Sequence, residues 1–169
     1  MRRILLTCTL AFTLLPVFGG EGKAPPMNKE KSLLIDYVDP FIGTTNFGTT
    51  NPGAVCPNGM MSVVPFNVMG SADNTYDKDA RWWSTPYEYT NCFFTGYSHV
   101  NLSGVGCPEL GSLLLMPTTG ELNVDYKEYG SKYKDEQASP GYYSNYLTKY
   151  NIKTEVSATP RTGIARFTF

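Results

Sequence analysis

Apolar and polar residues alternate most regularly near the end of the chain. From Tyr142 to Val156 the even positions are aromatic, β-branched or small, and most of the odd positions between them are polar. A period of two is typical of strands that have one buried face. Asn151 tolerates a left-handed backbone, so a turn over residues 149–151 folds this stretch into a hairpin. We expect two antiparallel strands whose even-numbered side chains face the core.

Shorter apolar runs predict further strands. Residues 60–64 lie between Gly59 and Pro65, and residues 113–116 end at Pro117. Short apolar runs bounded by Gly or Pro are typical of buried strands. Further strands are expected at residues 32–38 and 93–97, and in a last strand Ala165, Phe167 and Phe169 share a face. Residues 43–59, rich in Gly, Thr, Asn and Pro, are expected to form a long ordered loop, and residues 126–139 a charged surface segment.

The composition supports an all-β fold, mainly antiparallel. The 169 residues include 12 Tyr, 9 Phe, 16 Gly and 12 Pro. Aromatic side chains fit a pleated surface, while Gly and Pro form turns. The net charge is −1 and no basic run occurs, so nucleic acid is excluded as a partner.

The first residues have the form of a secretory signal peptide. Met1-Arg2-Arg3 is basic, residues 4–18 are mostly apolar, and Gly19-Gly20 supply small residues for cleavage. An N-terminal anchor helix is the alternative, although the apolar run is short for a membrane span. We therefore expect an exported protein, periplasmic, at the cell surface or secreted. Its signal peptide is expected at residues 1–20, a polar tether at 21–31 and a domain at 32–169, with no membrane span after cleavage.

Three cysteines remain after residues 1–20: Cys56, Cys92 and Cys107. An odd number leaves at least one thiol unpaired within the chain. We expect small, buried apolar side chains, with one disulfide possible and its pairing open.

Few residues point to chemistry by themselves. His99 is the only histidine, and no serine lies in a Gly-x-Ser-x-Gly elbow, so we expect a hydrogen-bonding histidine in a Gly-rich turn. Asp77 opens a calcium-loop template that fails at Arg81, which favours a solvated loop. No pair of acids is marked out by its spacing as a glycosidase pair.

Trp82 and Trp83 are unusual because they lie in a polar stretch. A flat aromatic face can stack on a sugar ring, and a hydrophobic plug that packs the loop down is the alternative. The residues alone indicate an exported β-rich domain with a possible sugar-facing loop.

Several ordered blocks resemble one family. Residues 36–44 (DYVDPFIGT), 51–60 (NPGAVCPNGM) and 94–107 (FTGYSHVNLSGVGC) look like the N-terminal blocks of glycoside hydrolase family 92, the exo-acting α-mannosidases. Residues 111–117 and 139–143 continue the series, so the resemblance covers roughly residues 36–169.

The resemblance implies the N-terminal β-sandwich of a two-domain enzyme whose larger C-terminal domain is an (α/α)₆ barrel. The family is calcium-dependent and hydrolyses terminal α-mannosides with inversion, commonly α-1,2 linkages of high-mannose N-glycans. The general acid and base and most calcium ligands belong to the C-terminal domain, so no catalytic residue is assigned here. Trp82, Trp83 and His99 are the substrate-binding candidates.

The chain stops on Phe169 within an apolar strand. We therefore expect a truncated sandwich with an exposed apolar edge, poorly soluble and inactive by itself. A non-catalytic carbohydrate-binding module is the alternative function. The reading frame beyond Phe169 distinguishes the two, because a hydrolase needs a long helical continuation.

Overall fold

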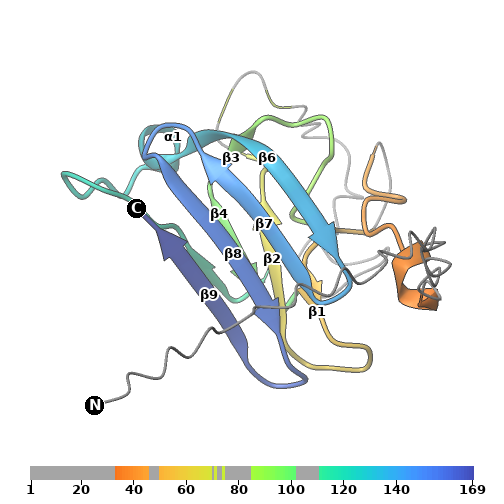
Figure 1. The fold of residues 1–169 in the computed structure, drawn as a ribbon. Coiled ribbons are helices and arrows are strands. Elements are labelled where there is room, and N and C mark those ends of the chain that lie inside the picture. Colours follow the sequence, from red (N-terminus) through yellow and green to blue (C-terminus); the bar gives the residue numbers. More distant parts are fainter. Residues whose placement is uncertain (1–32, 46–49, 70, 72–73, 75–84, 102–110) are drawn as a thin grey trace, which may run out of the picture. The chain divides into compact units, whose positions relative to one another are not determined.

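The computed structural model describes residues 33–45, 50–69, 71, 74, 85–101 and 111–169. Residues from Leu33 to Phe169 belong to one compact unit. Within the described residues, nine strands form two sheets (Figure 1). One sheet has the order β1 (Ala54–Val55), β2 (Ser62–Phe66), β4 (Gly96–His99) and β5 (Leu113–Leu115). The other has the order β3 (Phe93–Phe94), β6 (Ser131–Ser139), β7 (Tyr142–Leu147), β8 (Ile152–Ala158) and β9 (Gly163–Thr168).

All strand pairs are antiparallel, and the two sheets share one core. Aromatic and branched side chains from both sheets meet there, as the period of two requires when each sheet buries one face. The expected all-β sandwich is confirmed. The buried cluster consists of Ala54, Val63, Phe94, Tyr97, Tyr143, Leu147, Ile152 and Val156.

The expected hairpin is present, but one of its faces was assigned wrongly. Asn151 has a φ of 56°, as a left-handed turn residue should. In β8 the even residues face the core as expected, whereas in β7 the core residues are Tyr143 and Leu147. Tyr143 lies opposite Val156 and Leu147 opposite Ile152, so each odd position of β7 shares a face with an even position of β8. The alternation of inward and outward side chains holds within each strand, but the turn between the strands shifts it from odd to even positions.

The expected strand at residues 93–97 is two strands in different sheets. Phe93 and Phe94 pair with β6, and Gly96 begins the strand that pairs with β2. Thr95 lies between them and donates its backbone N–H to the Phe66 carbonyl at 2.9 Å. Gly96 has a φ of 146°, which glycine adopts without strain. The chain therefore crosses from one sheet to the other within three residues.

Two other segments differ from their expected form. The described part of the strand expected at residues 32–38 is not a strand: a 3₁₀-helix, η1 (Leu34–Tyr37), forms because the Asp36 carboxylate accepts the Leu33 N–H at 2.8 Å. Residues 126–139 are more than a surface segment, because the short helix α1 (Tyr126–Tyr129) leads into the nine-residue strand β6. An irregular pairing between Lys134 and Gln137 breaks the period of β6 and hid it in the sequence.

The remaining expectations are partly confirmed. The apolar run at 60–64 is a buried strand displaced to Ser62–Phe66, and the loop at 43–59 contains the short strand β1. The strand at 113–116 is present as β5, but its three leucines are exposed, since β5 is an outer strand. Ala165 and Phe167 pack on the core, whereas Phe169 is exposed.

The cysteines are less buried than expected. Cys56 is half-buried, Cys92 is exposed, and both are free thiols. Cys107, the expected signal peptide and the tether lie outside the described residues. In the part of the chain that the structure describes, no helix is long and apolar enough to cross a membrane.

Gly96→Ala should destabilise the fold by about 2–4 kcal/mol, because strain in a glycine-only conformation adds to overpacking. A Cβ at Gly96 would lie 2.9 Å from Leu114 Cδ1 and 3.0 Å from the Leu115 carbonyl oxygen. Urea unfolding measures the loss. Gly120→Ala is the control, since Gly120 also has a positive φ, 87°, but nothing lies within 4 Å of its added Cβ. Equal losses in the two variants would contradict the close packing at the crossing.

Candidate functional site

His99 lies at the end of β4, where the strand enters the Gly-rich loop. Its Nδ1 is 3.3 Å from the Leu113 carbonyl oxygen, and the residue is half-buried. Nε2 has no partner among the described residues. The expected hydrogen-bonding histidine is therefore present, with one ring nitrogen left for another group.

The residues after His99 are fixed to β2. Val100 has a φ of 58° and donates its N–H to the Ser62 carbonyl at 3.2 Å. Asn101 donates its N–H to Ser62 Oγ at 2.8 Å, and its Oδ1 accepts the Ser98 hydroxyl at 2.8 Å. The chain therefore leaves the sheet in a defined direction.

The other sequence candidates cannot be placed. Trp82, Trp83 and the aspartates Asp73, Asp77 and Asp79 lie outside the described residues. Binding of substrate by the tryptophans and His99 stays a prediction.

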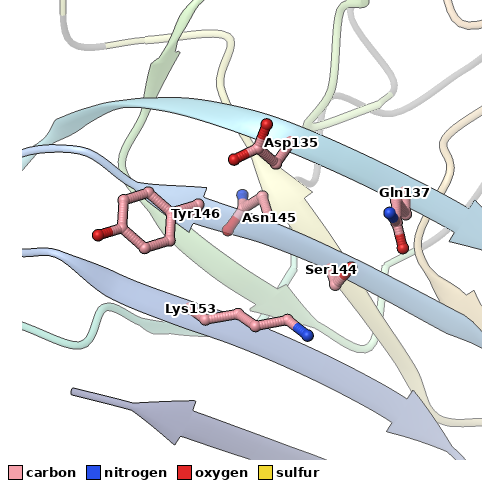
Figure 2. A pocket seen from close by; sticks show the side chains of 6 residues that line it. All are labelled: Asp135, Gln137, Ser144, Asn145, Tyr146 and Lys153. Carbon is pink, nitrogen blue, oxygen red and sulfur yellow. The ribbon is translucent and has the colours of Figure 1, made fainter.

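The structure shows a polar depression that the sequence did not indicate. It has a volume of about 170 Å³ and lies on the outer face of the five-stranded sheet (Figure 2). Side chains from three adjacent strands, β6, β7 and β8, surround it. The lining residues are Asp135, Gln137, Ser144, Asn145, Tyr146 and Lys153.

The depression offers both donors and acceptors. Ser144 is only 2% exposed, and its hydroxyl has no hydrogen-bond partner among the described residues. Lys153 Nζ lies 3.4 Å from Glu155 Oε1, and Lys134 Nζ lies 5.2 Å from the centre of the Tyr146 ring. The one carboxylate in the lining is Asp135, and glycoside hydrolysis requires two. The lining of the depression is therefore polar and holds a single carboxylate.

The irregular pairing in β6 directs the Glu136 carboxylate toward the interior of the sandwich. Lys134 lies opposite Tyr146 and Gln137 opposite Ser144, so Asp135 and Glu136 together face the single residue Asn145. Two residues opposite one define a β-bulge. Asp135 adopts a φ of 53°, and the bulge directs Glu136 toward the tyrosines of the interior.

Glu136 accepts hydrogen bonds from two tyrosines. Tyr87 donates its hydroxyl to the two carboxylate oxygens at 2.9 and 3.0 Å, and Tyr143 donates at 2.5 Å. Burial is the larger effect and raises the pKa of Glu136 above its ordinary value, while these two hydrogen bonds partly offset it. Burial also raises the pKa of both tyrosines, so they remain protonated donors.

The network continues across the core to the other sheet. Asn145 Nδ2 lies 3.4 Å from the Tyr143 hydroxyl, and its Oδ1 accepts Thr154 Oγ1 at 2.5 Å. Tyr97 of β4 lies 2.5 Å from Thr154 Oγ1 and 3.3 Å from Asn145 Oδ1. Buried polar groups thus join β4 to β7 and β8. Neither periodicity nor a motif marked them in the sequence, because each lies in a strand with ordinary polar neighbours.

Residues that could hold a metal ion do not come together in the described ranges: no group of three His, Cys, Asp or Glu side chains meets there.

Comparison with known proteins identifies the family. The family description "Glycosyl hydrolase family 92 N-terminal domain" matches residues 37–169. The chain belongs to glycoside hydrolase family 92. The match covers nearly all of the compact unit, so the sandwich is the N-terminal domain of this family, as its motifs predicted.

Solved family 92 structures have the same fold. The α-mannosidase BT3965 from Bacteroides thetaiotaomicron is 35% identical, with a TM-score of 0.66, and the match covers 80% of this chain and 18% of that one. Its complex with mannoimidazole matches equally well. The family 92 inverting mannosidase BT2199 from Bacteroides thetaiotaomicron VPI-5482 is 26% identical, with a TM-score of 0.59, and the match covers 80% and 18% of the two chains. A search of curated proteins found no match.

This domain therefore spans less than a fifth of the length of the solved α-mannosidase that it matches. The solved relatives contain further polypeptide that these residues do not include.

Tyr143→Phe tests the buried network. The variant loses the hydroxyl that donates to Glu136, and we expect a loss of about 1.5–3 kcal/mol in unfolding free energy because that bond is charge-assisted. Tyr146→Phe is the control, since its hydroxyl makes one exposed contact of 3.4 Å to Asn151, and it should change stability by less than about 0.5 kcal/mol. Denaturant unfolding measures the unfolding free energy of both variants. If Tyr143→Phe loses no more than Tyr146→Phe, the network does not stabilise the fold.

Glu136→Gln tests the raised pKa. A raised pKa in the fold means that the native state binds a proton more readily, so Glu136 stabilises the fold most below pH 4.5. Relative to the Gln variant, the wild type should lose unfolding free energy as the pH rises through the pKa of the folded state. The difference between the two pH curves removes the opposite contribution of Glu155, whose pKa is lowered by hydrogen bonding to Arg166. A difference independent of pH contradicts the prediction.

Proposed function

We propose that this chain is the N-terminal domain of an exported, calcium-dependent, inverting exo-α-mannosidase that removes terminal mannose, commonly α-1,2-linked, from N-glycans. The observation that carries the proposal is the family match over residues 37–169. The structural match to a solved α-mannosidase at 35% identity supports it. The mannoimidazole complex of that relative supports a mannose-type substrate.

In the proposed enzyme, the catalytic residues belong to polypeptide outside these residues, and this domain helps to bind the sugar. An inverting glycosidase needs a general acid and a general base about 6.5–9.5 Å apart, with a water between them. We propose that both carboxyl groups belong to the C-terminal (α/α)₆ domain. The sandwich then contributes one wall of the sugar pocket, through the loop that begins at His99 and through Trp82 or Trp83.

The structure of β4 is suited to that role. Tyr97 is anchored in the core by Thr154, and Asn101 is anchored on Ser62, so His99 is held between two fixed points. A hydrogen-bonding group held in this way loses little entropy when it binds a sugar hydroxyl. His99 would orient substrate, and no proton transfer is assigned to it.

Calcium and export are parts of the proposal that rest on the family resemblance and on the N-terminal sequence. Calcium would be held mainly by residues of the C-terminal domain. Residues 1–20 would be removed during export. They contain two of the 14 Lys and Arg residues and none of the 15 Asp and Glu residues, so the remaining chain has 12 basic and 15 acidic residues and a net charge of −3.

A non-catalytic carbohydrate-binding module is the second candidate. The polar depression favours it, because the buried Ser144 hydroxyl and the exposed Gln137 amide could bind sugar hydroxyl groups on the outer sheet face. Binding to mannose oligosaccharides by this domain alone, lost in Ser144→Val, would favour the module.

The 169-residue chain should not hydrolyse α-1,2-mannobiose or aryl α-mannosides, because it lacks the acid and base. The polypeptide translated from the reading frame extended beyond Phe169 should hydrolyse them with inversion and lose activity on calcium chelation. Product anomers followed by NMR give the stereochemistry. Turnover by the short chain, or a stop codon directly after Phe169, would contradict the proposal.

A further inference from the structure

The depression on the outer face of the five-stranded sheet contains a buried hydroxyl that is free to bind. Ser144 is 2% exposed, and its hydroxyl has no hydrogen-bond partner among the described residues. Buried hydroxyl groups of native proteins nearly always have a partner, which is a protein group, a water molecule or a ligand. The partner of Ser144 therefore has to come from the depression that it lines.

The neighbours of Ser144 across the sheet explain why its hydroxyl is free. Ser144 lies opposite Gln137 of β6 and opposite Glu155 of β8. The Glu155 carboxylate already accepts hydrogen bonds from Tyr142 at 2.8 Å and from Arg166 at 2.7 Å. The Gln137 amide is exposed and makes no hydrogen bond within the described residues. A free hydroxyl and a free amide thus line the depression from adjacent strands.

The bulge in β6 adds a carboxylate on the same face. Tyr133 packs against the core, so regular alternation would direct Asp135 inward as well. Asp135 instead has a φ of 53° and lines the depression, while Glu136 bonds to the core tyrosines (Figure 2). Bulges are frequent next to functional sites, where they redirect a side chain. This bulge therefore supplies a hydrogen-bond acceptor to the outer face as well as to the core.

The charges around the depression favour a neutral ligand. Its lining contains one carboxylate, Asp135, and one ammonium group, Lys153. The carboxylate repels an anion and the ammonium group repels a cation. A neutral molecule with donors and acceptors meets neither repulsion, because Asp135 accepts, Lys153 donates, and a serine hydroxyl or a glutamine amide does both. Sugar hydroxyl groups fit such a lining, since each of them can donate and accept.

The size of the depression suits one sugar residue. A water molecule takes about 30 Å³ in the liquid, so the volume of about 170 Å³ holds several waters or one larger group. Pockets for drug-sized ligands are larger, roughly 300–1,000 Å³. The Tyr146 ring belongs to the lining and adds an apolar surface beside the polar groups (Figure 2). A hexose, with hydroxyl groups and C–H faces, matches this combination.

We propose that the depression is a second, non-catalytic sugar site, which binds one hexose residue of the glycan through Ser144, Gln137 and Asp135. The proposal rests on the proposed function, which supplies the mannose-containing glycan. The site is distinct from the pocket wall at His99, because His99 belongs to the four-stranded sheet. An enzyme that holds a branched glycan at a second site raises the effective concentration of the other branches at its catalytic pocket.

Amide NMR of the 169-residue chain during titration with methyl α-mannoside tests the proposal. The amides of residues 135–137, 144–146 and 153 should shift together and saturate in the millimolar range, since an open site with few hydrogen bonds binds weakly. The amides of β2, which lies in the other sheet, are the internal control. Inorganic phosphate is the second probe and should shift these amides less. No shift at the depression, or a stronger response to phosphate, would overturn the proposal.

Ser144→Ala separates binding from stability. The variant loses one hydrogen bond to the sugar, so its dissociation constant should rise about twofold to tenfold. Its melting temperature should be unchanged or higher, because the lost hydroxyl is buried without a protein partner. Ser157→Ala is the matched control and should bind normally, since this outward-facing serine of β8 already donates to the Gly141 carbonyl at 2.8 Å. A lower melting temperature of Ser144→Ala with unchanged binding would assign the hydroxyl a structural role and contradict the proposal.

The polypeptide extended beyond Phe169 separates this proposal from the proposed function. Affinity electrophoresis through α-mannan should retard it, and Ser144→Ala should reduce the retardation where Ser157→Ala does not. If the depression binds the mannoside but the extended polypeptide does not hydrolyse α-mannosides, the enzyme proposal fails, the sugar site stands and the domain is a binding module. If the extended polypeptide hydrolyses α-mannosides and the depression binds no sugar, the proposed function stands and the second site is wrong.

Discussion

The interior of this sandwich depends on one half-buried carboxylate and the hydroxyl groups arranged around it. Glu136 enters the core because a β-bulge places two residues of β6 opposite one residue of β7. Burial of a carboxylate is costly unless hydrogen bonds compensate for the lost water. Tyr87 and Tyr143 provide those hydrogen bonds, and both tyrosines are themselves buried. The bulge and the tyrosines therefore require one another.

This network also links the fold to the proposed sugar-binding edge. Asn145 and Thr154 extend it to Tyr97, which belongs to the opposite sheet. Tyr97 is only two residues before His99 on the same strand, so the position of the histidine is set by contacts in the core. A polar network of this kind fixes the relative position of two sheets more specifically than apolar packing does. His99 is thus held on a strand that core contacts fix in place.

The two outer surfaces of the domain have different properties. The five-stranded sheet presents a polar depression with a buried hydroxyl, whereas β5 presents leucines and a free edge. The first is compatible with water or a polar ligand, whereas exposed leucines are poorly solvated.

The sequence by itself determined the fold class, the hairpin around Asn151 and the family, because these follow from local turn chemistry, a period of two and ordered motifs. The tertiary structure alone decided which residues of β7 face inward, since that depends on the residue opposite each one in β8. It also decided that β6 is a strand and that Glu136 accepts hydrogen bonds from two core tyrosines, because a bulge interrupts the period on which sequence reasoning relies. The exposure of β5 was invisible for the same physical reason: an apolar run shows that a strand needs covering, and only its neighbours in space show whether it is covered.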